Sequence, residues 1–353
     1  MKKISPIYLD SASTSKVDSR VLDEMLPYFL EYFGNASSYH LLGKKSKEAI
    51  EKARSQVSNI INCDSKEIIF TSGATESINL AIKGFTESNV DKGNHVITVK
   101  TEHKAVLATC EYLETKGFEV TYLDVDNNGL ISIDQLKSSV KDNTILVIVM
   151  YVNNETGVIQ PINEIGKVAS ELDIAFFCDA TQTIGKLPVD VVNDNIDMLC
   201  FSGHKINGPK GIGVLYKKKN IELTPLIHGG GQEYNLRSGT YNTPLIVGLG
   251  KACEIANIEL EKNIKKLLLK KKEIEEYYEV NNIGKVNFKY VKKAPHIISI
   301  TLNDYEAEEY LIIKSNEFYA STGSACNSEV IEISHVLRAM NIDFPKKIIR
   351  ISI

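Results

Sequence analysis

The chain has 353 residues, of which 43% are hydrophobic and 24% are charged, and its formal net charge at pH 7 is −4. These values are typical of a globular protein with one large domain or two, and they exclude a chain-wide basic field for nucleic acid or membranes. The six cysteines are scattered without a CxxC pair, which argues against a disulfide framework or a zinc site. We therefore expect no bound metal. Because no apolar run has membrane-spanning length, we also expect a cytoplasmic protein.

Between about residues 47 and 253, β-rich runs alternate with helical patterns. Apolar spacing predicts helices over 47–61 and 73–85. Several β-rich runs are apolar throughout, as in strands that are buried on both faces of a parallel sheet. These runs span 67–72, 95–99, 119–123, 144–152, 174–178 and 197–201. The alternation predicts an α/β domain with a mainly parallel sheet, with expected bounds at residues 15–253.

The pattern changes after about residue 254, where strict strand–helix alternation stops. The elements expected there are a Lys/Glu-rich helix over roughly 254–279, strands over 285–291 and 296–302, and a helix near 305–314. We therefore predict a smaller α+β domain, formed by residues 1–14 and 254–353.

The stretch "TSGATES" (71–77) joins a predicted strand to a predicted helix. Gly73 would let the backbone approach a ligand closely, and Thr75 and Ser77 add hydroxyl groups at the helix start. Free N–H groups and the helix dipole attract anions there, which favours a phosphate site. The alternative is ordinary capping of the helix N-terminus by these side chains.

Two further motifs follow buried strands, where ligands of α/β sheets bind. In "FFCDATQT" (176–183), Asp179 could cap a helix or pair with a cationic ring nitrogen, and Gln182 could reach the same ligand. In "FSGHKINGPKG" (201–211), Lys205 stands among small and polar neighbours. A lysine in such a position is a candidate for covalent attachment to a carbonyl compound, although most lysines only solvate a surface.

These groups together fit pyridoxal 5′-phosphate (PLP), which requires a lysine, an acidic partner for its ring nitrogen and a phosphate site. Lys205 and Asp179 would supply the first two. The candidate phosphate ligands are Thr75, Ser202 and His204. His103 follows the strand at 95–99 and could stack on the ring, or it could be a capping or surface residue.

With these motifs in place, the chain resembles the cysteine desulfurases of the NifS/IscS type, in the class V aminotransferase superfamily. The matching stretches follow one another in the family's order and cover nearly the whole chain apart from about 255–294. They are "YLDSAST", "FGNASSYH", "IIFTSGATESINLAIKG", "KTEHKAVL", "VNNETGVIQPI", "CDATQTIGKLPVD", "SGHKINGPKGIGVLY", "HGGG", "RSGT" and "STGSACNS".

The resemblance implies the type I fold of PLP-dependent transferases and a role for each matching residue. Lys205 would hold PLP covalently, His103 would stack on its ring, and Asp179 would pair with the ring nitrogen. Gln182 would contact the phenolic oxygen. The other cofactor ligands implied are Ala74, Thr75, Ser202, His204 and, from the neighbouring subunit of a homodimer, Thr240. The residues implied for the carboxylate of the substrate L-cysteine are Asn35, Asn154 and Arg350.

Cys326 stands in "STGSAC" (321–326), on a loop of small residues that we place at about 318–330. The resemblance implies that its thiolate attacks the substrate sulfur, holds it as a persulfide and passes it to an acceptor protein. This role needs a thiol with a low pKa or a nearby base. It also explains a cysteine on a loop, because a packed side chain could not carry sulfur outward.

The chain ends three residues after Arg350, whereas family members usually continue for tens of residues. This difference favours a specialised desulfurase that serves tRNA thiolation or DNA phosphorothioate modification over one that docks the iron–sulfur scaffold protein. Two other interpretations stay open at this point. One is another PLP enzyme, such as a selenocysteine lyase, and the other is an inactive adaptor.

Overall fold

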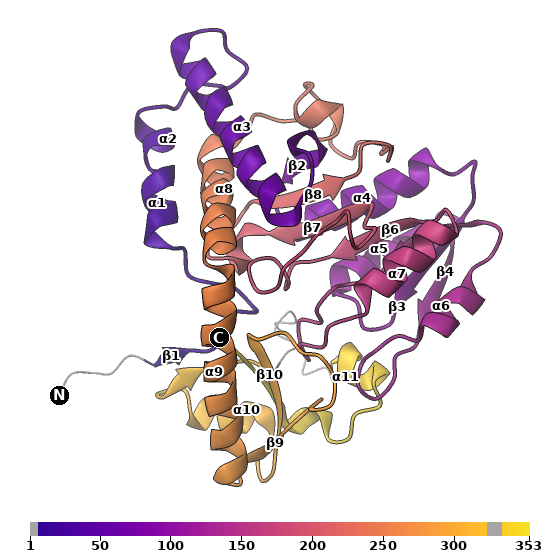
Figure 1. Ribbon diagram of the computed structural model, residues 1–353, viewed down its shortest axis with the longest axis vertical. Helices are drawn as coiled ribbons and strands as arrows, with labels where there is room; N and C mark the ends of the chain where they lie inside the picture. Colours follow the sequence, from indigo (N-terminus) through magenta and orange to yellow (C-terminus); the bar gives the residue numbers. More distant parts are fainter. Residues whose placement is uncertain (1–5, 323–333) are drawn as a thin grey trace.

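The computed structural model describes residues 6–322 and 334–353. The larger of its two main parts is built around a sheet of seven strands, which Figure 1 shows with its covering helices. The strand order is β2-β8-β7-β6-β5-β3-β4. Strand β8 runs antiparallel to both of its neighbours, and the other pairings are parallel. The strands are β2 (Ile68–Thr71), β3 (His95–Val99), β4 (Glu119–Leu123), β5 (Thr144–Ile148), β6 (Ala175–Asp179), β7 (Met198–Ser202) and β8 (Gly213–Lys217). The predicted mainly parallel sheet is confirmed.

Helices cover both faces of this sheet, which explains the continuous apolar runs in its strands. Phe176 packs in the core on one face, with α3, α7 and α8, whereas the next residue, Phe177, packs on the other face with α4 and α5. Successive side chains of a strand point to opposite faces, so each face needs its own apolar cover. These helices are α3 (Leu41–Ile61), α4 (Ala74–Ser88), α5 (Lys104–Glu114), α7 (Ile162–Glu171) and α8 (Thr243–Ile258).

Most predicted strands agree with the structure to within one residue at either end, but two are shorter than predicted. The run at 144–152 is a strand only as far as Ile148. The run at 285–291 contributes only β9 (Gly284–Val286), because the backbone turns at Phe288, whose φ is 56°. The helix predicted over 254–279 is two helices, since α8 ends at Ile258 and α9 (Leu260–Val280) begins after Glu259.

A second, antiparallel sheet lies at the other end of the molecule, with the order β12-β10-β9 (Figure 1). It contains β9, β10 (Ile297–Leu302) and β12 (Ile348–Ser352). Its apolar face packs against Tyr278 of α9 and Tyr310 of α10 (Ala307–Ile313). The helix near 305–314 and the strand at 296–302 therefore form as predicted.

The N-terminal segment runs along this second sheet and then enters the space between the two sheets. Strand β1 (Ile7–Tyr8) pairs in parallel with β11 (Phe318–Tyr319), and Asp10 forms a bridge with Ser352. Leu9 belongs to the core of the second sheet. The following residues, 11–15, are thereby brought from one sheet to the edge of the other.

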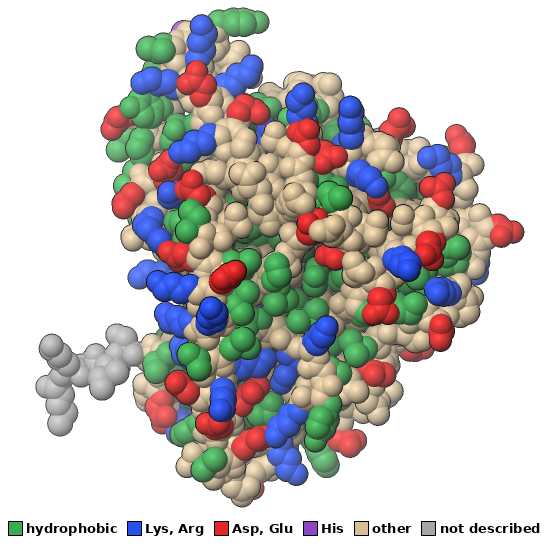
Figure 2. All heavy atoms as spheres, in the orientation of Figure 1, with side chains coloured by type: hydrophobic (Ala, Val, Ile, Leu, Met, Phe, Trp, Pro, Cys, Tyr) green, Lys and Arg blue, Asp and Glu red, His purple; other side chains and the backbone are tan. Residues whose placement is uncertain are grey.

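The surface in Figure 2 carries lysine, arginine and acidic side chains interspersed, as the small net charge predicts. Within residues 6–322 and 334–353, no helix combines the length and the apolar character needed to cross a membrane. The remaining helices are α1 (Ser19–Met25), α2 (Pro27–Leu30), α6 (Ile133–Ser139) and α11 (His335–Ala339).

Candidate active site

A cavity of about 600 Å³ opens where the parallel strands of the large sheet end and the second sheet approaches them. Most of the residues singled out in the sequence line it. They are Ala74, Thr75, His103, Asn154, Asp179, Gln182, Ser202, His204, Lys205 and Arg350. The segments that follow strands β2, β3, β5, β6 and β7 all contribute to this lining, as expected for a ligand site of an α/β sheet.

The N-terminus of α4 forms one end of the cavity. Its N-cap residue is Gly73, and no side chain caps the helix, so the interpretation of "TSGATES" as ordinary capping is wrong. Ser77 is also unavailable to a ligand, because its hydroxyl is buried and lies 2.7 Å from the Thr71 hydroxyl. A Cβ atom at Gly73 would stand 3.8 Å from Ser202 Oγ, in the space that an anion would fill. The uncapped N–H groups of this 15-residue helix are therefore available to an anion.

Asp179 and His103 both line the cavity, with Asp179 as the last residue of β6 and His103 between β3 and α5. Asp179 is 5% exposed, and its Oδ1 accepts a hydrogen bond of 2.9 Å from the Thr181 N–H. His103 caps α5 through Nδ1, which accepts from the Ala105 N–H at 3.1 Å. The capping alternative for His103 is thus correct, yet the same ring also lines the cavity.

Burial keeps the two cavity imidazoles neutral. It lowers the pKa of His103, with Asp179 opposing this effect and Lys205 adding to it. Burial also lowers the pKa of His204 to about 4, helped by the positive charges of Lys205 and Lys210. Both rings can therefore stack or accept hydrogen bonds at neutral pH without adding charge.

Lys205 stands in a short 3₁₀ turn (Gly203–Lys205) directly after β7. Its Nζ donates to two backbone carbonyls of the N-terminal segment, Ala12 O at 2.5 Å and Ser13 O at 2.8 Å. The Ala12 carbonyl also accepts from Gln182 Nε2 at 2.9 Å. The N-terminal segment thus aligns the lysine and the glutamine on one side of the cavity.

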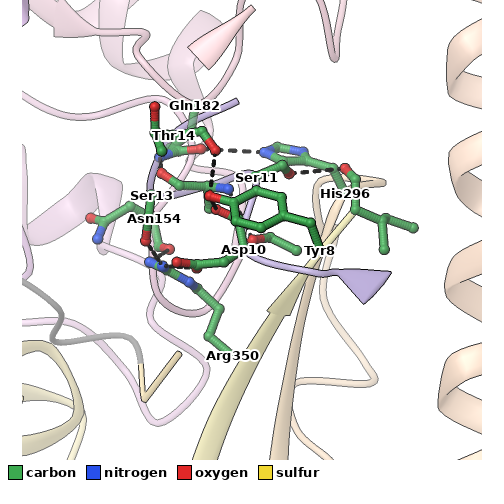
Figure 3. Close-up of polar contacts among 12 residues, drawn as sticks. Tyr8, Asp10, Ser11, Ser13, Thr14, Asn154, Gln182, His296 and Arg350 are labelled. Atoms are coloured by element: carbon green, nitrogen blue, oxygen red, sulfur yellow. Dashed lines mark hydrogen bonds and ion pairs between the residues drawn. The ribbon is translucent and has the colours of Figure 1, made fainter. Parts of the chain in front are cut away.

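Arg350 enters the cavity from β12 of the second sheet (Figure 3). Its guanidinium donates to Asp10 Oδ1 at 2.8 Å, to Ser13 Oγ at 2.6 Å and to the Asn154 carbonyl at 3.0 Å. Its buried Nε has no hydrogen-bond partner among the described residues. A guanidinium held in this way is well placed to receive a carboxylate.

Two predicted site residues are not part of this cavity. Asn35 and Thr240 are exposed and do not line it. The Asn35 side chain instead accepts from the Ser37 N–H at 2.9 Å. Cys326 lies outside the described residues, as does most of the loop predicted at 318–330.

The segment that carries Thr240 is tied to the large sheet by a buried ion pair. Arg54 of α3 and Glu233 are 2% and 3% exposed, and two N–H···O contacts of 2.8 Å join them. Glu233 also accepts from the Phe70 N–H at 2.8 Å. Further along, Arg237 pairs with Glu76 of α4 at 2.9 Å. These ties hold residues 233–237 against the large sheet and against α4, whose N-terminus lines the cavity.

Sequence reasoning missed several groups that line the cavity or support it. Ser13, Thr14 and Lys210 line it, and Thr14 Oγ1 lies 3.1 Å from His204 Nδ1. Ser13 and Thr14 belong to the quoted motif "YLDSAST", so the signal was present without an assigned role. Asp10, in the same motif, holds Arg350.

The residues present fit PLP. The cavity offers the amine of Lys205, the carboxylate of Asp179 and an uncapped helix N-terminus with the Ser202 hydroxyl beside it. Lys205, Lys210 and Arg350 bring three positive charges to a ligand that would carry a phosphate and a carboxylate. A charge set of this sign and an open anion cradle at Gly73 are what the cofactor and an amino-acid substrate require.

The comparisons with known proteins agree with this chemistry. The family model described as "Aminotransferase class-V" matches residues 7–353. The cysteine desulfurase IscS of Ehrlichia chaffeensis is 48% identical over 356 residues, which cover 96% of this chain and 83% of that protein. A solved NifS-like protein has a TM-score of 0.92 at 36% identity, covering 99% of this chain and 93% of its own. A structure of SspA in complex with cysteine has a TM-score of 0.87 at 40% identity, covering 98% of both chains. The chain therefore belongs to the class-V aminotransferase family and, within it, to the PLP-dependent cysteine desulfurases of the NifS/IscS type.

Proposed function

We propose that this cysteine desulfurase converts L-cysteine to L-alanine and moves the sulfur through Cys326 to an acceptor protein. The observation that carries the proposal is the single cavity in which Lys205, Asp179 and Arg350 meet. An amine for the cofactor aldehyde, an acid for its ring nitrogen and a guanidinium for the substrate carboxylate are thereby within reach of one amino acid.

Each side of the cavity would hold a different part of the cofactor. Lys205 would bind it covalently, and Asp179 would keep its ring nitrogen protonated. His103 would stack on the ring, and Gln182 would donate to the phenolic oxygen. The phosphate would lie at the N-terminus of α4, with Ala74, Thr75, Ser202 and His204 around it. When bound, PLP supplies a sink for the electron pair that remains on the substrate after proton loss.

The chain's own residues would orient the substrate and move its protons. Arg350 and the neighbouring Asn154 would bind the carboxylate and turn the α-carbon toward Lys205. With the cofactor and substrate bound, the Lys205 Nζ would take the α-proton of the substrate and later return a proton to the product. The Asn35 role proposed from the family resemblance requires a different placement, since Asn35 does not line the cavity of its own chain.

Sulfur transfer would then proceed as an exchange that balances without an added oxidant. The thiolate of Cys326 attacks the sulfur of the bound cysteine, an S–S bond forms, and the C–S bond breaks. The electron pair of that bond stays with the carbon, which takes up a proton and leaves as alanine. Cys326 keeps the sulfur as a persulfide until an acceptor thiol removes it.

The five cysteines that the structure describes are poor candidates for the nucleophile, which supports the choice of Cys326. Burial raises the pKa of the thiols at Cys63, Cys110, Cys178, Cys200 and Cys253, so none of these five is a ready nucleophile. A reducing cytoplasm would keep both Cys326 and the acceptor thiols reduced, and we propose that the enzyme works there.

We further propose a homodimer in which the exposed Thr240 reaches the cofactor phosphate of the second copy. Support comes from the apolar surface around α2 and the start of α3, where side chains are unusually exposed for their size. They are Phe29 (53%), Leu30 (77%), Phe33 (69%), Tyr39 (96%) and Leu41 (69%). Asn35 lies among them, so a second copy that covers this surface would bring Asn35 into the interface as well.

The test is alanine release from L-cysteine in the presence of a reductant, with wild type beside Cys326→Ala and Lys205→Ala. We expect wild type to release alanine and both variants to fail, with Cys326→Ala still binding PLP. Full activity of Cys326→Ala would contradict the sulfur relay, and faster turnover of selenocysteine would favour a selenocysteine lyase. A colourless wild type that takes up no PLP would favour an inactive adaptor.

A further inference from the structure

His296 is a buried histidine to which neither the sequence motifs nor the cavity lining assigns a role. It lies directly before β10, and its side chain is 1% exposed. Its Nε2 lies 3.3 Å from Oε1 of Gln182, and the two side chains lie side by side (Figure 3). Gln182 lines the cavity and His296 does not, so His296 reaches the cavity through Gln182.

The neighbours of Gln182 fix the orientation of both side chains. Gln182 Nε2 is 2.9 Å from the Ala12 carbonyl, which can only accept, so the amide nitrogen must face that carbonyl. The amide oxygen then faces His296 and can also only accept. His296 must therefore carry its proton on Nε2, and Nδ1 keeps a lone pair that has no partner among the described residues.

The surroundings of His296 favour the neutral ring that this arrangement needs. Burial holds the pKa of His296 well below its ordinary value. The charged groups that lower it further are all positive, and they come from several elements. They are Lys186, Lys271, Arg350 and Lys205. Lys271 of α9 also donates to the Ala294 carbonyl at 2.8 Å, which anchors the segment that carries the histidine.

We propose that His296 is a positioning residue that fixes the amide of Gln182, so that its second Nε2–H points at the phenolic oxygen of bound PLP. With one hydrogen bond to Ala12, the amide could rotate about that bond. With a second bond from His296, its plane is set and the free N–H has one direction. The inference rests on the proposed function because Gln182 is the contact to the cofactor in that proposal.

The arrangement has a spectroscopic consequence. A hydrogen bond to the ionised phenolic oxygen favours the deprotonated form of the Lys205-bound cofactor, so losing it raises the pH at which the visible band changes. Replacing His296 removes only the neutral hydrogen bond between His296 and Gln182. A bond of this kind changes equilibrium constants by about 2- to 13-fold, which corresponds to a shift of about 0.4 to 1 pH unit. We expect cofactor loss from the holoenzyme to accelerate by a similar factor.

The experiment titrates the visible band of the holoenzyme without cysteine, in wild type, His296→Leu, His296→Gln and His95→Leu. Leucine removes the donor, whereas glutamine can place an N–H where Nε2 was. His95 is the matched control, because it is fully buried and bonded to Thr144 and Thr121 at the start of β3, far from the carboxyl ends of the strands. We expect a raised midpoint in His296→Leu, recovery in His296→Gln and no shift in His95→Leu.

Equal midpoints in wild type and His296→Leu, or equal shifts in His296→Leu and His95→Leu, would overturn the proposal. If His296→Leu does not fold, His296→Asn replaces it, since the shorter amide cannot reach Gln182 and should raise the midpoint above that of His296→Gln. Equal midpoints in those two variants would also overturn it. A wild type that binds PLP but releases no alanine would contradict only the proposed function, whereas one that binds no PLP would contradict both.

Discussion

The two sheets contribute to the cavity in different ways. The large sheet contributes through the segments that follow its strands, which supply Thr75, His103 and Lys205 from short local motifs. The second sheet contributes from within or beside its strands, with Arg350 in β12 and His296 before β10. In the proposed function these segments would surround the cofactor, whereas the second sheet would set the directions of groups that face the substrate or orient a cofactor contact. Substitutions on the large-sheet side should therefore change how the cofactor works, whereas substitutions of Arg350 on the second-sheet side should change how cysteine binds.

Replacing Asp179 should cause the largest loss, because it acts on the cofactor itself. We expect Asp179→Ala to lower kcat by about 100- to 1,000-fold, as for loss of a group that stabilises developing charge. Steady-state alanine release measures this. The control is Asp197→Ala, at the opposite end of the large sheet, where the side chain accepts from the Phe176 N–H. An Asp179→Ala enzyme with normal kcat would contradict the assigned role.

Replacing Arg350 should affect the substrate and leave the cofactor unchanged, which sharpens the comparison between the sheets. We expect Arg350→Gln to lower kcat/KM for cysteine by about 10- to 100-fold, mainly through KM, since a charge-assisted hydrogen bond contributes about 1.5 to 3 kcal/mol. The visible spectrum of the holoenzyme should stay as in wild type. Arg20→Gln, on an exposed ion pair of α1, should change neither quantity. A lost visible band in Arg350→Gln would break the division between the two sides.

The smallest effect concerns the acid stability of the cofactor-free protein. His204 has a pKa of about 4 in the folded chain, whereas an unfolded histidine titrates near 6.5. The unfolded state therefore binds more protons between these values, and stability falls as pH is lowered through that window. We expect His204→Gln to lose less thermal stability than wild type between pH 7 and pH 5, as followed by melting temperature. An equal or larger loss in the variant would show that His204 does not stay neutral.

The large-sheet side of the site could be predicted from the sequence because its information is local. Apolar runs mark the strands, and residues such as Asp179 and Lys205 follow them directly, so their common location follows from parallel pairing alone. The direction of β8 was not predictable in this way, because a run such as "GVLYK" carries no mark of the neighbour with which it pairs.

The second-sheet side depends on contacts between distant parts of the chain. Arg350 meets Asp10 across 340 positions, and His296 meets Gln182 across 114. Neither periodicity nor local turn chemistry carries such pairs. The exposure of Asn35 and Thr240 was equally hidden, since it depends on where the loops lie in the folded chain and not on the motifs that contain them.

The buried pair of Arg54 and Glu233 restricts how this sequence can change over generations. Loss of one partner leaves an uncompensated charge in the interior, which costs about 3 to 5 kcal/mol, whereas loss of both in favour of well-packed apolar side chains is often neutral. Single substitutions at either position should therefore be removed by selection, and the two should be inherited or exchanged together. Among related sequences we expect these positions to covary, although 179 residues separate them.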